Sequence, residues 1–158
     1  MEIKAGEVLF IDTNVLLTAT DESRSHFDTV RRLFVAAFRT GFHLGLNGQI
    51  MREYLVVATR AQEINGLGLS SEEAIENIEE FRRRATLFEE REAVTGHLVQ
   101  LARRHGLTEK RIHDANIVAT MLTYNITKLV TENTKDFTDF SEIQVLDLNK
   151  VSRMMEDC

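Results

Sequence analysis

Apolar residues along this chain occur either in short continuous runs or in longer stretches with helical spacing. The run at 7–12 is apolar and contains β-branched and aromatic residues, which predicts a buried strand. From 25 to 41 the apolar positions recur every three or four residues, which predicts a helix that ends at Gly41. A second strand is predicted at 42–46, and Asn47 after it can cap another helix. The chain is therefore expected to begin with strand, helix, strand and helix.

The same alternation continues to the end of the chain. After a loop at Gly66–Gly68, Ser70 and Glu73 form a capping box for a further helix. Short strands are predicted at three more places: 86–88, 127–131 and 143–148. Strands that alternate with helices favour a mostly parallel sheet covered on both faces. We therefore expect an α/β fold, a three-layer sandwich around a five-stranded sheet.

The aromatic residues predict part of the core, and the absence of a linker-like segment predicts the number of domains. Five phenylalanines match helix or strand periodicity and are predicted to lie in the core: Phe27, Phe34, Phe38, Phe42 and Phe81. The chain has no proline and no segment rich in glycine or serine, so nothing in it resembles a linker. A single domain over 1–158, with its core at about 7–148, is the expected organisation.

Composition narrows the class of protein. The 158 residues are 43% hydrophobic and 28% charged, which excludes a disordered chain. The only cysteine is Cys158, which excludes an intrachain disulfide and a cysteine-rich zinc site and fits a reducing compartment. The apolar stretch Val8–Leu17 is too short and too polar for a membrane span, and Glu2 and Glu7 stand where a signal peptide has basic residues. We expect a cytoplasmic protein with no membrane association.

Charge and the placement of acids point to a cation site. A net charge of −6 argues against a protein that holds nucleic acid mainly by a basic surface. In parallel sheets, ligands bind beyond the carboxyl ends of the strands, where Asp12 and the segment 131–136 are predicted to lie. Glu53 follows the second strand, and Asp114 lies near the start of a helix. If these acids converge, the pocket would bind Mg²⁺ or Mn²⁺, either as one ion or as two ions about 3.5 to 4 Å apart.

Four motifs in order along the chain resemble the PIN-domain family, and within it the VapC toxins of type II toxin-antitoxin systems. The motifs run from about residue 8 to residue 148 and are Ile11-Asp12-Thr13-Asn14-Val15-Leu16-Leu17, Arg52-Glu53-Tyr54, His113-Asp114-Ala115 and Leu129-Val130-Thr131-Glu132-Asn133-Thr134-Lys135-Asp136-Phe137. One departure is the segment Asn47-Gly48-Gln49, which stands where many members have a proline.

This resemblance implies a PIN-like fold with a five-stranded parallel sheet and an endoribonuclease that depends on Mg²⁺, with Mn²⁺ as a substitute. It also implies a cognate antitoxin, an RNA substrate and a homodimer. The four metal-binding and catalytic acids carried over by motif are Asp12, Glu53, Asp114 and Asp136. Groups implied to orient these acids or metal-bound waters are Thr13, Asn14, Thr131 and Asn133. Asn133 stands where many members have an acid, so it is the alternative to Asp136 as fourth ligand.

Two basic segments have different expected roles. Four cations lie just before Asp114 and are candidates to contact RNA phosphates, although a solvated face is the alternative: Arg103, Arg104, Lys110 and Arg111. The run 82–84 follows several glutamates on a predicted helix, where ion pairs at helical spacing account for it.

Other classes of function fit the residues less well. A PIN-like module without catalysis, which binds RNA or protein, remains an alternative. A phosphoacceptor receiver would have an adjacent acid pair, and an aspartate-nucleophile phosphatase would have Asp-x-Asp, whereas this chain has Asp12-Thr13-Asn14. The sequence also lacks a P-loop, a Gly-x-Ser-x-Gly elbow and the zinc motif His-Glu-x-x-His.

Overall fold

A computed structural model of the chain describes residues 3–156, so Glu2 and Cys158 lie outside the described residues. Its centre is one parallel sheet of five strands, as predicted: β1 (Val8–Ile11), β2 (His43–Asn47), β3 (Thr86–Phe88), β4 (Lys128–Val130) and β5 (Gln144–Leu146). The strand order is β3-β2-β1-β4-β5, which puts β1 in the middle between β2 and β4. The carboxyl ends of β1 and β4, which carry Asp12 and Thr131, are therefore neighbours.

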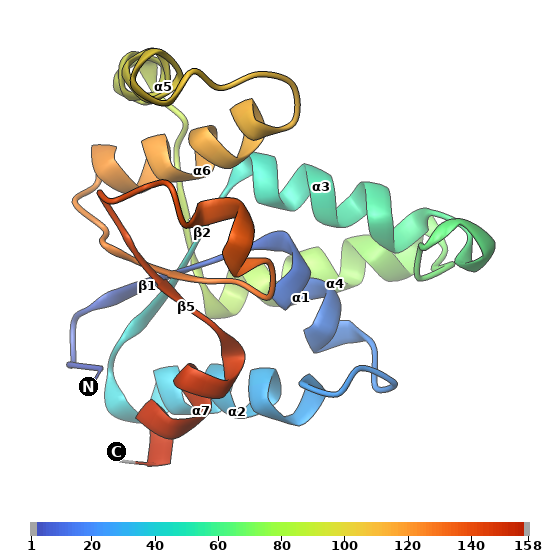
Figure 1. Cartoon of the computed structure of the whole chain (residues 1–158). Coiled ribbons are helices and arrows are strands. Elements are labelled where there is room, and N and C mark those ends of the chain that lie inside the picture. The colour runs from blue at the N-terminus through green and yellow to red at the C-terminus, as the bar shows by residue number, and fades with distance from the viewer. Residues whose placement is uncertain (1–2, 157–158) are drawn as a thin grey trace.

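Helices cover both faces of this sheet. The described residues form seven α-helices: α1 (Thr13–Thr20), α2 (Phe27–Thr40), α3 (Gly48–Thr59), α4 (Ser71–Arg84), α5 (Glu92–His105), α6 (Arg111–Thr123) and α7 (Leu148–Glu156). Two 3₁₀ helices, η1 (Gln62–Ile64) and η2 (Thr134–Phe137), lie in the connections. Figure 1 shows α5 and α6 on one side of the sheet and α2 and α7 on the other. The expected three-layer arrangement is confirmed.

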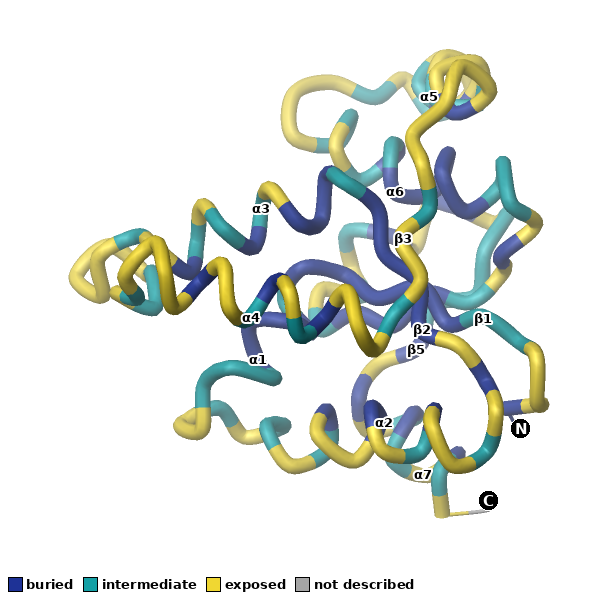
Figure 2. Tube along the Cα trace, turned by 180° about the vertical axis from the view of Figure 1, so that it is seen from behind, coloured by how far each residue is buried: buried dark blue, intermediate teal, exposed yellow. Residues whose placement is uncertain are grey.

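The caps that begin two helices are those predicted. The side chain of Asn47 accepts a hydrogen bond from the backbone N–H of Ile50 and begins α3. Ser70 and Glu73 form both hydrogen bonds of a capping box and begin α4. Helices α3 and α4 pack side by side, and Figure 2 shows the segment that joins them exposed at one end of the molecule.

The core is apolar, but one predicted member does not belong to it. Phe34, Phe42 and Phe81 are buried, Phe27 is half-buried, and Phe38 is 91% exposed. On α2 the buried positions 30, 33, 34 and 37 span about 100° of the helix, and Phe38 falls about 40° beyond the edge of that stripe. The prediction that Phe38 is a core residue is therefore wrong.

Candidate active site

Asp12 lies directly after β1 and caps α1. One carboxylate oxygen accepts a hydrogen bond from the backbone N–H of Thr13 (2.7 Å), and the other accepts from the Thr131 hydroxyl (2.7 Å) and the Asn14 amide (3.2 Å). The residue is only 7% exposed. Burial raises the pKa of Asp12, the hydrogen bonds from Thr131 and Thr13 oppose that shift, and the charge of Glu53 adds to it. The carboxylate is therefore held in one orientation.

The segments that follow β1 and β4 are tied to each other at this point. Asn14 donates a hydrogen bond to the Thr131 hydroxyl oxygen (3.2 Å) and accepts one from the backbone N–H of Glu132 (3.0 Å). The backbone N–H of Asn133 donates to the same Thr131 oxygen (3.0 Å). These contacts fix the start of the loop that leads to Asn133 and Asp136.

Glu53 comes from α3 and is held at both oxygens. Its Oε2 accepts a hydrogen bond from the Thr13 hydroxyl (2.8 Å), and its Oε1 accepts from the Gln49 amide (2.8 Å). Gln49 is buried and also donates to the backbone carbonyl of His113 (2.9 Å), which joins α3 to α6. Sequence analysis missed this role for Gln49; the available signal was a polar side chain one helical turn before Glu53.

Asp114 comes from the first turn of α6 and is only partly compensated. Its side chain is 20% exposed, and its Oδ2 is buried with no hydrogen-bond partner among the described residues. The nearest cation is Arg111, whose Nε lies 3.6 Å from that oxygen. Burial raises the pKa of Asp114 to about 6, and the charges of Asp136 and Asp12 add to the shift.

The structure brings the four acids predicted from the sequence to one cavity. Asp12, Glu53, Asp114 and Asp136 line it together with Asn133, and its volume is about 580 Å³. Thr13 and Asn14 also line it, whereas Thr131 acts from behind Asp12. Two cations to which sequence analysis gave no role also line the cavity: Arg52 of α3 and Arg60, which directly follows that helix.

The donor set of this cavity suits a hard divalent cation. Its side chains offer carboxylate and amide oxygens, which Mg²⁺ and Mn²⁺ prefer. The buried Oδ2 of Asp114 accepts no hydrogen bond from residues 3–156 and has only the Arg111 guanidinium near it, at 3.6 Å, so such an ion would supply a direct partner. Within residues 3–156 no three Asp, Glu, His or Cys side chains stand together as an already formed metal site.

The four cations predicted to contact RNA do not line this cavity. Arg104 forms an ion pair with Glu142, and Arg111 lies 3.4 Å from Asp139 as well as near Asp114. Arg103 and Lys110 are exposed at the surface. Two of the four cations, Arg104 and Arg111, are therefore already paired with neighbouring acids.

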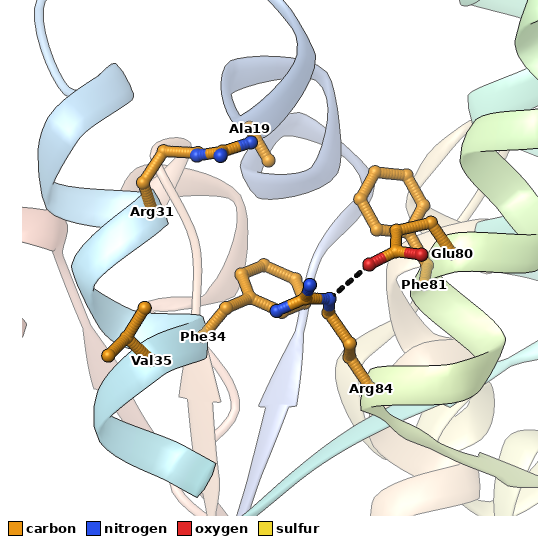
Figure 3. Close-up of a pocket in the computed structure, with 7 residues that line it drawn as sticks. All are labelled: Ala19, Arg31, Phe34, Val35, Glu80, Phe81 and Arg84. Carbon is orange, nitrogen blue, oxygen red and sulfur yellow. Dashed lines mark hydrogen bonds and ion pairs between the residues drawn. The ribbon is translucent and has the colours of Figure 1, made fainter. Parts of the chain in front are cut away.

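A second hollow, between α2 and α4, has a different character (Figure 3). Its volume is about 200 Å³, and its lining residues are Ala19, Arg31, Phe34, Val35, Glu80, Phe81 and Arg84. The one acid among them, Glu80, is paired with Arg84 and with Arg83 at 2.7 Å. This hollow contains no set of uncompensated acids.

Comparison with known proteins identifies the family. The model of the PIN domain matches residues 9–143 of this chain. The chain belongs to the PIN domain family. All of the lining acids of the cavity lie within the matched part of the PIN domain. A comparison with curated proteins finds no match.

Solved structures similar to this PIN domain share its fold at low sequence identity. VapBC2 from Rickettsia felis, bound to a DNA fragment from its promoter, is 16% identical with a TM-score of 0.66, over 89% of this chain and 98% of that one. A toxin-antitoxin complex from Klebsiella pneumoniae is 18% identical with a TM-score of 0.56, over 89% and 97%. VapC20 from Mycobacterium tuberculosis, a toxin that cleaves the sarcin-ricin loop, is 13% identical with a TM-score of 0.58, over 77% and 86%.

No helix within residues 3–156 of this PIN domain has the length and hydrophobicity that crossing a membrane requires.

Proposed function

We propose that this protein is a Mg²⁺-dependent endoribonuclease, able to use Mn²⁺, and the toxin of a toxin-antitoxin pair in the cytoplasm. The observation that carries the proposal is the convergence of four acids from four separate segments on one cavity, where a buried oxygen of Asp114 has no hydrogen-bond partner among residues 3–156. Family membership and the fold shared with VapC20, a toxin that cleaves the sarcin-ricin loop, support a nuclease.

The proposed metal ligands are Asp12, Asp114, Glu53 and Asp136, with Asn133 as a neutral donor. When bound, the cation would lower the pKa of a coordinated water and neutralise charge on the phosphodiester. Thr131 and Asn14 hold the Asp12 carboxylate at a fixed orientation through Oδ2, and Gln49 and Thr13 hold Glu53. These side chains are positioned before any ligand arrives, so little reorganisation is needed on binding.

The proposed partners are an RNA substrate, a cognate antitoxin and a second copy of this chain. The antitoxin is supported by the shared fold of VapBC2 and of the toxin-antitoxin complex from Klebsiella pneumoniae. Co-expression with the product of a short adjacent reading frame should yield a complex on size-exclusion chromatography with light scattering. A chain that stays unbound and does not inhibit growth when expressed alone would contradict the toxin role.

The metal-dependent nuclease is tested with the parent and Asp12→Asn on structured RNAs. We expect cleavage by the parent in Mg²⁺ or Mn²⁺, none in EDTA, and none by the variant. Asp12→Asn keeps the size of the side chain and removes a buried charge and the repulsion from Glu53, but its NH₂ group cannot accept the hydrogen bonds that one carboxylate oxygen receives. The two effects oppose each other, so the variant should fold with a melting temperature close to that of the parent. Cleavage by Asp12→Asn at the parent rate would refute the assignment.

Thermal melting distinguishes this proposal from a catalytically silent module. An ion that binds only the folded state raises the melting temperature. We expect millimolar Mn²⁺ to raise it for the parent and not for Asp12→Asn. The same melting temperature of the parent with and without Mn²⁺ would favour the silent module.

A further inference from the structure

One side of α3 brings two arginines to the cavity that holds the acids. Four residues of this helix and the residue that directly follows it line the cavity: Arg52, Glu53, Val56 and Val57, and then Arg60. Arg52 and Arg60 are two turns apart, which separates their backbone positions by about 12 Å along the helix axis. Val56 stands between them at the surface and is 58% exposed. The wall formed by Arg52, Val56 and Arg60 is called the α3 wall below.

Neither arginine of the α3 wall is neutralised. Among residues 3–156 neither guanidinium has a hydrogen bond or an ion pair, although both side chains line the same cavity as four carboxylates. Other arginines of this chain do pair with acids, as Arg24 does with Asp21 and Arg83 with Glu80. The cavity therefore keeps both an uncompensated negative region and an uncompensated positive one.

The backbone of Arg60 is fixed by the loop that follows α3. The backbone N–H of Gly68 donates to the carbonyl of Arg60 (2.8 Å), and that of Leu67 donates to the carbonyl of Val57 (3.1 Å). The chain passes so close at Gly66 that a Cβ there would lie 1.9 Å from the carbonyl oxygen of Arg60. The Gly66–Gly68 segment thus closes the end of the helix and leaves the Arg60 guanidinium free.

A ligand that complements both the negative and the positive region of the cavity carries a phosphate group next to a bound cation. We propose that Arg52 and Arg60 form the phosphate-binding wall for RNA, contacting phosphates that flank the phosphodiester held at the carboxylates. This inference rests on the proposed ribonuclease function. Charges along one strand recur about every 3.4 Å in a stacked duplex, so the two arginines span roughly three nucleotides. The exposed Val56 between them offers an apolar contact for a ribose or a base.

The wall replaces the α5–α6 cations as the main RNA contact. Arg104 and Arg111 are already paired with Glu142 and Asp139, so binding a phosphate would require breaking these ion pairs. Arg103 is exposed and does not line the cavity. Arg103→Ala is therefore the matched control, because it removes the same charge outside the cavity.

The test is fluorescence anisotropy of a labelled single-stranded RNA in EDTA, where cleavage does not occur, over a range of salt concentrations. The proteins are the parent, Arg52→Ala, Arg60→Ala, the double variant and Arg103→Ala. Each wall variant should bind about three- to tenfold more weakly and should lower the slope of log affinity against log salt by about 0.7, since one phosphate contact is lost. The double variant should lose about twice as much slope, and Arg103→Ala should match the parent.

Two further measurements show that the effect concerns RNA. In Mn²⁺ the wall variants should raise the KM for RNA cleavage with little change in kcat. The increase in melting temperature caused by Mn²⁺ should equal that of the parent, because the carboxylates are intact. If Arg60→Ala fails to fold, Arg60→Gln and the exposed Arg52→Ala provide the same comparison.

Three outcomes would overturn the inference while the ribonuclease assignment stands. One is an unchanged salt slope in the wall variants, or an equal loss in Arg103→Ala. Another is loss of the increase in melting temperature caused by Mn²⁺, which would mean that the arginines support metal binding by the carboxylates and not RNA binding. The third is a changed oligomeric state with unchanged RNA affinity, which would make the wall a protein interface. A parent that neither binds nor cleaves RNA would instead refute the proposed function itself.

Discussion

Two of the hollows in this molecule differ in how their acids are compensated. In the hollow between α2 and α4, Glu80 accepts hydrogen bonds from Arg83 and Arg84, and the bond from Arg83 is the main cause that lowers the pKa of Glu80. In the cavity at the carboxyl ends of the strands, burial and the neighbouring acids raise the pKa of Asp114 to about 6. Both regions have arginines nearby. Glu80 receives direct hydrogen bonds from two of them, whereas Asp114 has one arginine at 3.6 Å and no hydrogen bond to its buried oxygen.

The difference separates an acid that surface arginines neutralise from acids whose charge is not offset in the folded protein. A neutralised surface carboxylate such as Glu80 contributes little to stability and nothing to chemistry. A partly buried carboxylate without a counterion costs stability, and a perturbed pKa inside a cavity is typical of functional sites. The comparison of these two hollows leads to four predictions and one control variant, beginning with the largest expected effect.

Replacing Asp114 should separate activity from stability most clearly. Asp114→Asn removes a proposed metal ligand, so cleavage of RNA in Mn²⁺ should decrease about a thousandfold or more. The free energy of unfolding should stay the same or increase, because the repulsion from Asp136 and Asp12 disappears. The measurements are a gel-based cleavage assay and urea denaturation. Normal cleavage by this variant would mean that Asp114 is not part of the active site.

A substitution in the hollow between α2 and α4 should have the opposite effect, because it should reduce stability and leave cleavage unchanged. Phe81 is buried on α4 and packs edge-on against the ring of Tyr54, with centroids 5.2 Å apart. Phe81→Ala should reduce the free energy of unfolding by about 3 kcal/mol through the lost contacts and the new cavity. Cleavage per folded molecule should not change.

The exposed Phe38 provides the control for that variant. It lies on α2 and is 91% exposed, so Phe38→Ala should change the free energy of unfolding by less than about 0.5 kcal/mol. Denaturation curves of both variants in urea give the comparison. Equal destabilisation by the two substitutions would mean that Phe38 is packed in solution.

The pH dependence of stability should also reflect Asp114. Its pKa is raised from the usual 3.8 to about 6 in the folded state, so the folded protein holds this proton more tightly than the unfolded chain. The contribution of this group to stability is therefore complete below about pH 4 and is lost as the pH rises through 6, by about 2 kcal/mol.

This effect is measured without metal as the difference between the parent and Asp114→Asn. Urea denaturation in EDTA at pH 4.5 and pH 7 should show that the variant gains stability relative to the parent at the higher pH. A difference that is the same at both pH values would mean that the carboxyl titrates normally.

The smallest effect is expected for the paired acid. Glu80→Gln makes the same chemical change as Asp114→Asn, on a carboxylate that arginines already neutralise. Cleavage should equal that of the parent, and the melting temperature should change little, because exposed ion pairs stabilise proteins weakly. A loss of cleavage here would show that the two hollows are functionally linked.

Most of the architecture could be predicted from local patterns. The strands are short apolar runs, and Asn47 and Ser70 begin α3 and α4 through their own side chains, so these signals depend on few distant contacts. Helix α1 was not predicted, because Asp12-Thr13-Asn14 also suits a turn and the helix is too short to show clear periodicity. Helix α7 follows β5 after a single residue and was likewise not predicted.

The site could be predicted only in part. The motif resemblance supplied the acids that the structure places around one cavity. Gln49, Arg52 and Arg60 were missed because their roles depend on which side of α3 faces the loops after β1 and β4. The pairing of Arg104 with Glu142 joins residues 38 positions apart, and no local pattern indicates it.

The central place of β1 in the sheet determines when the acid-lined cavity can form during folding. Asp12 is made almost at once during synthesis, yet the hydroxyl that orients it belongs to a residue 119 positions later. Parallel pairing between such distant strands forms late in folding. A nascent chain therefore carries Asp12 long before the loop with Asn133 and Asp136 leaves the ribosome. Under the proposed function, the chain would not cleave the surrounding RNA until its sheet is complete.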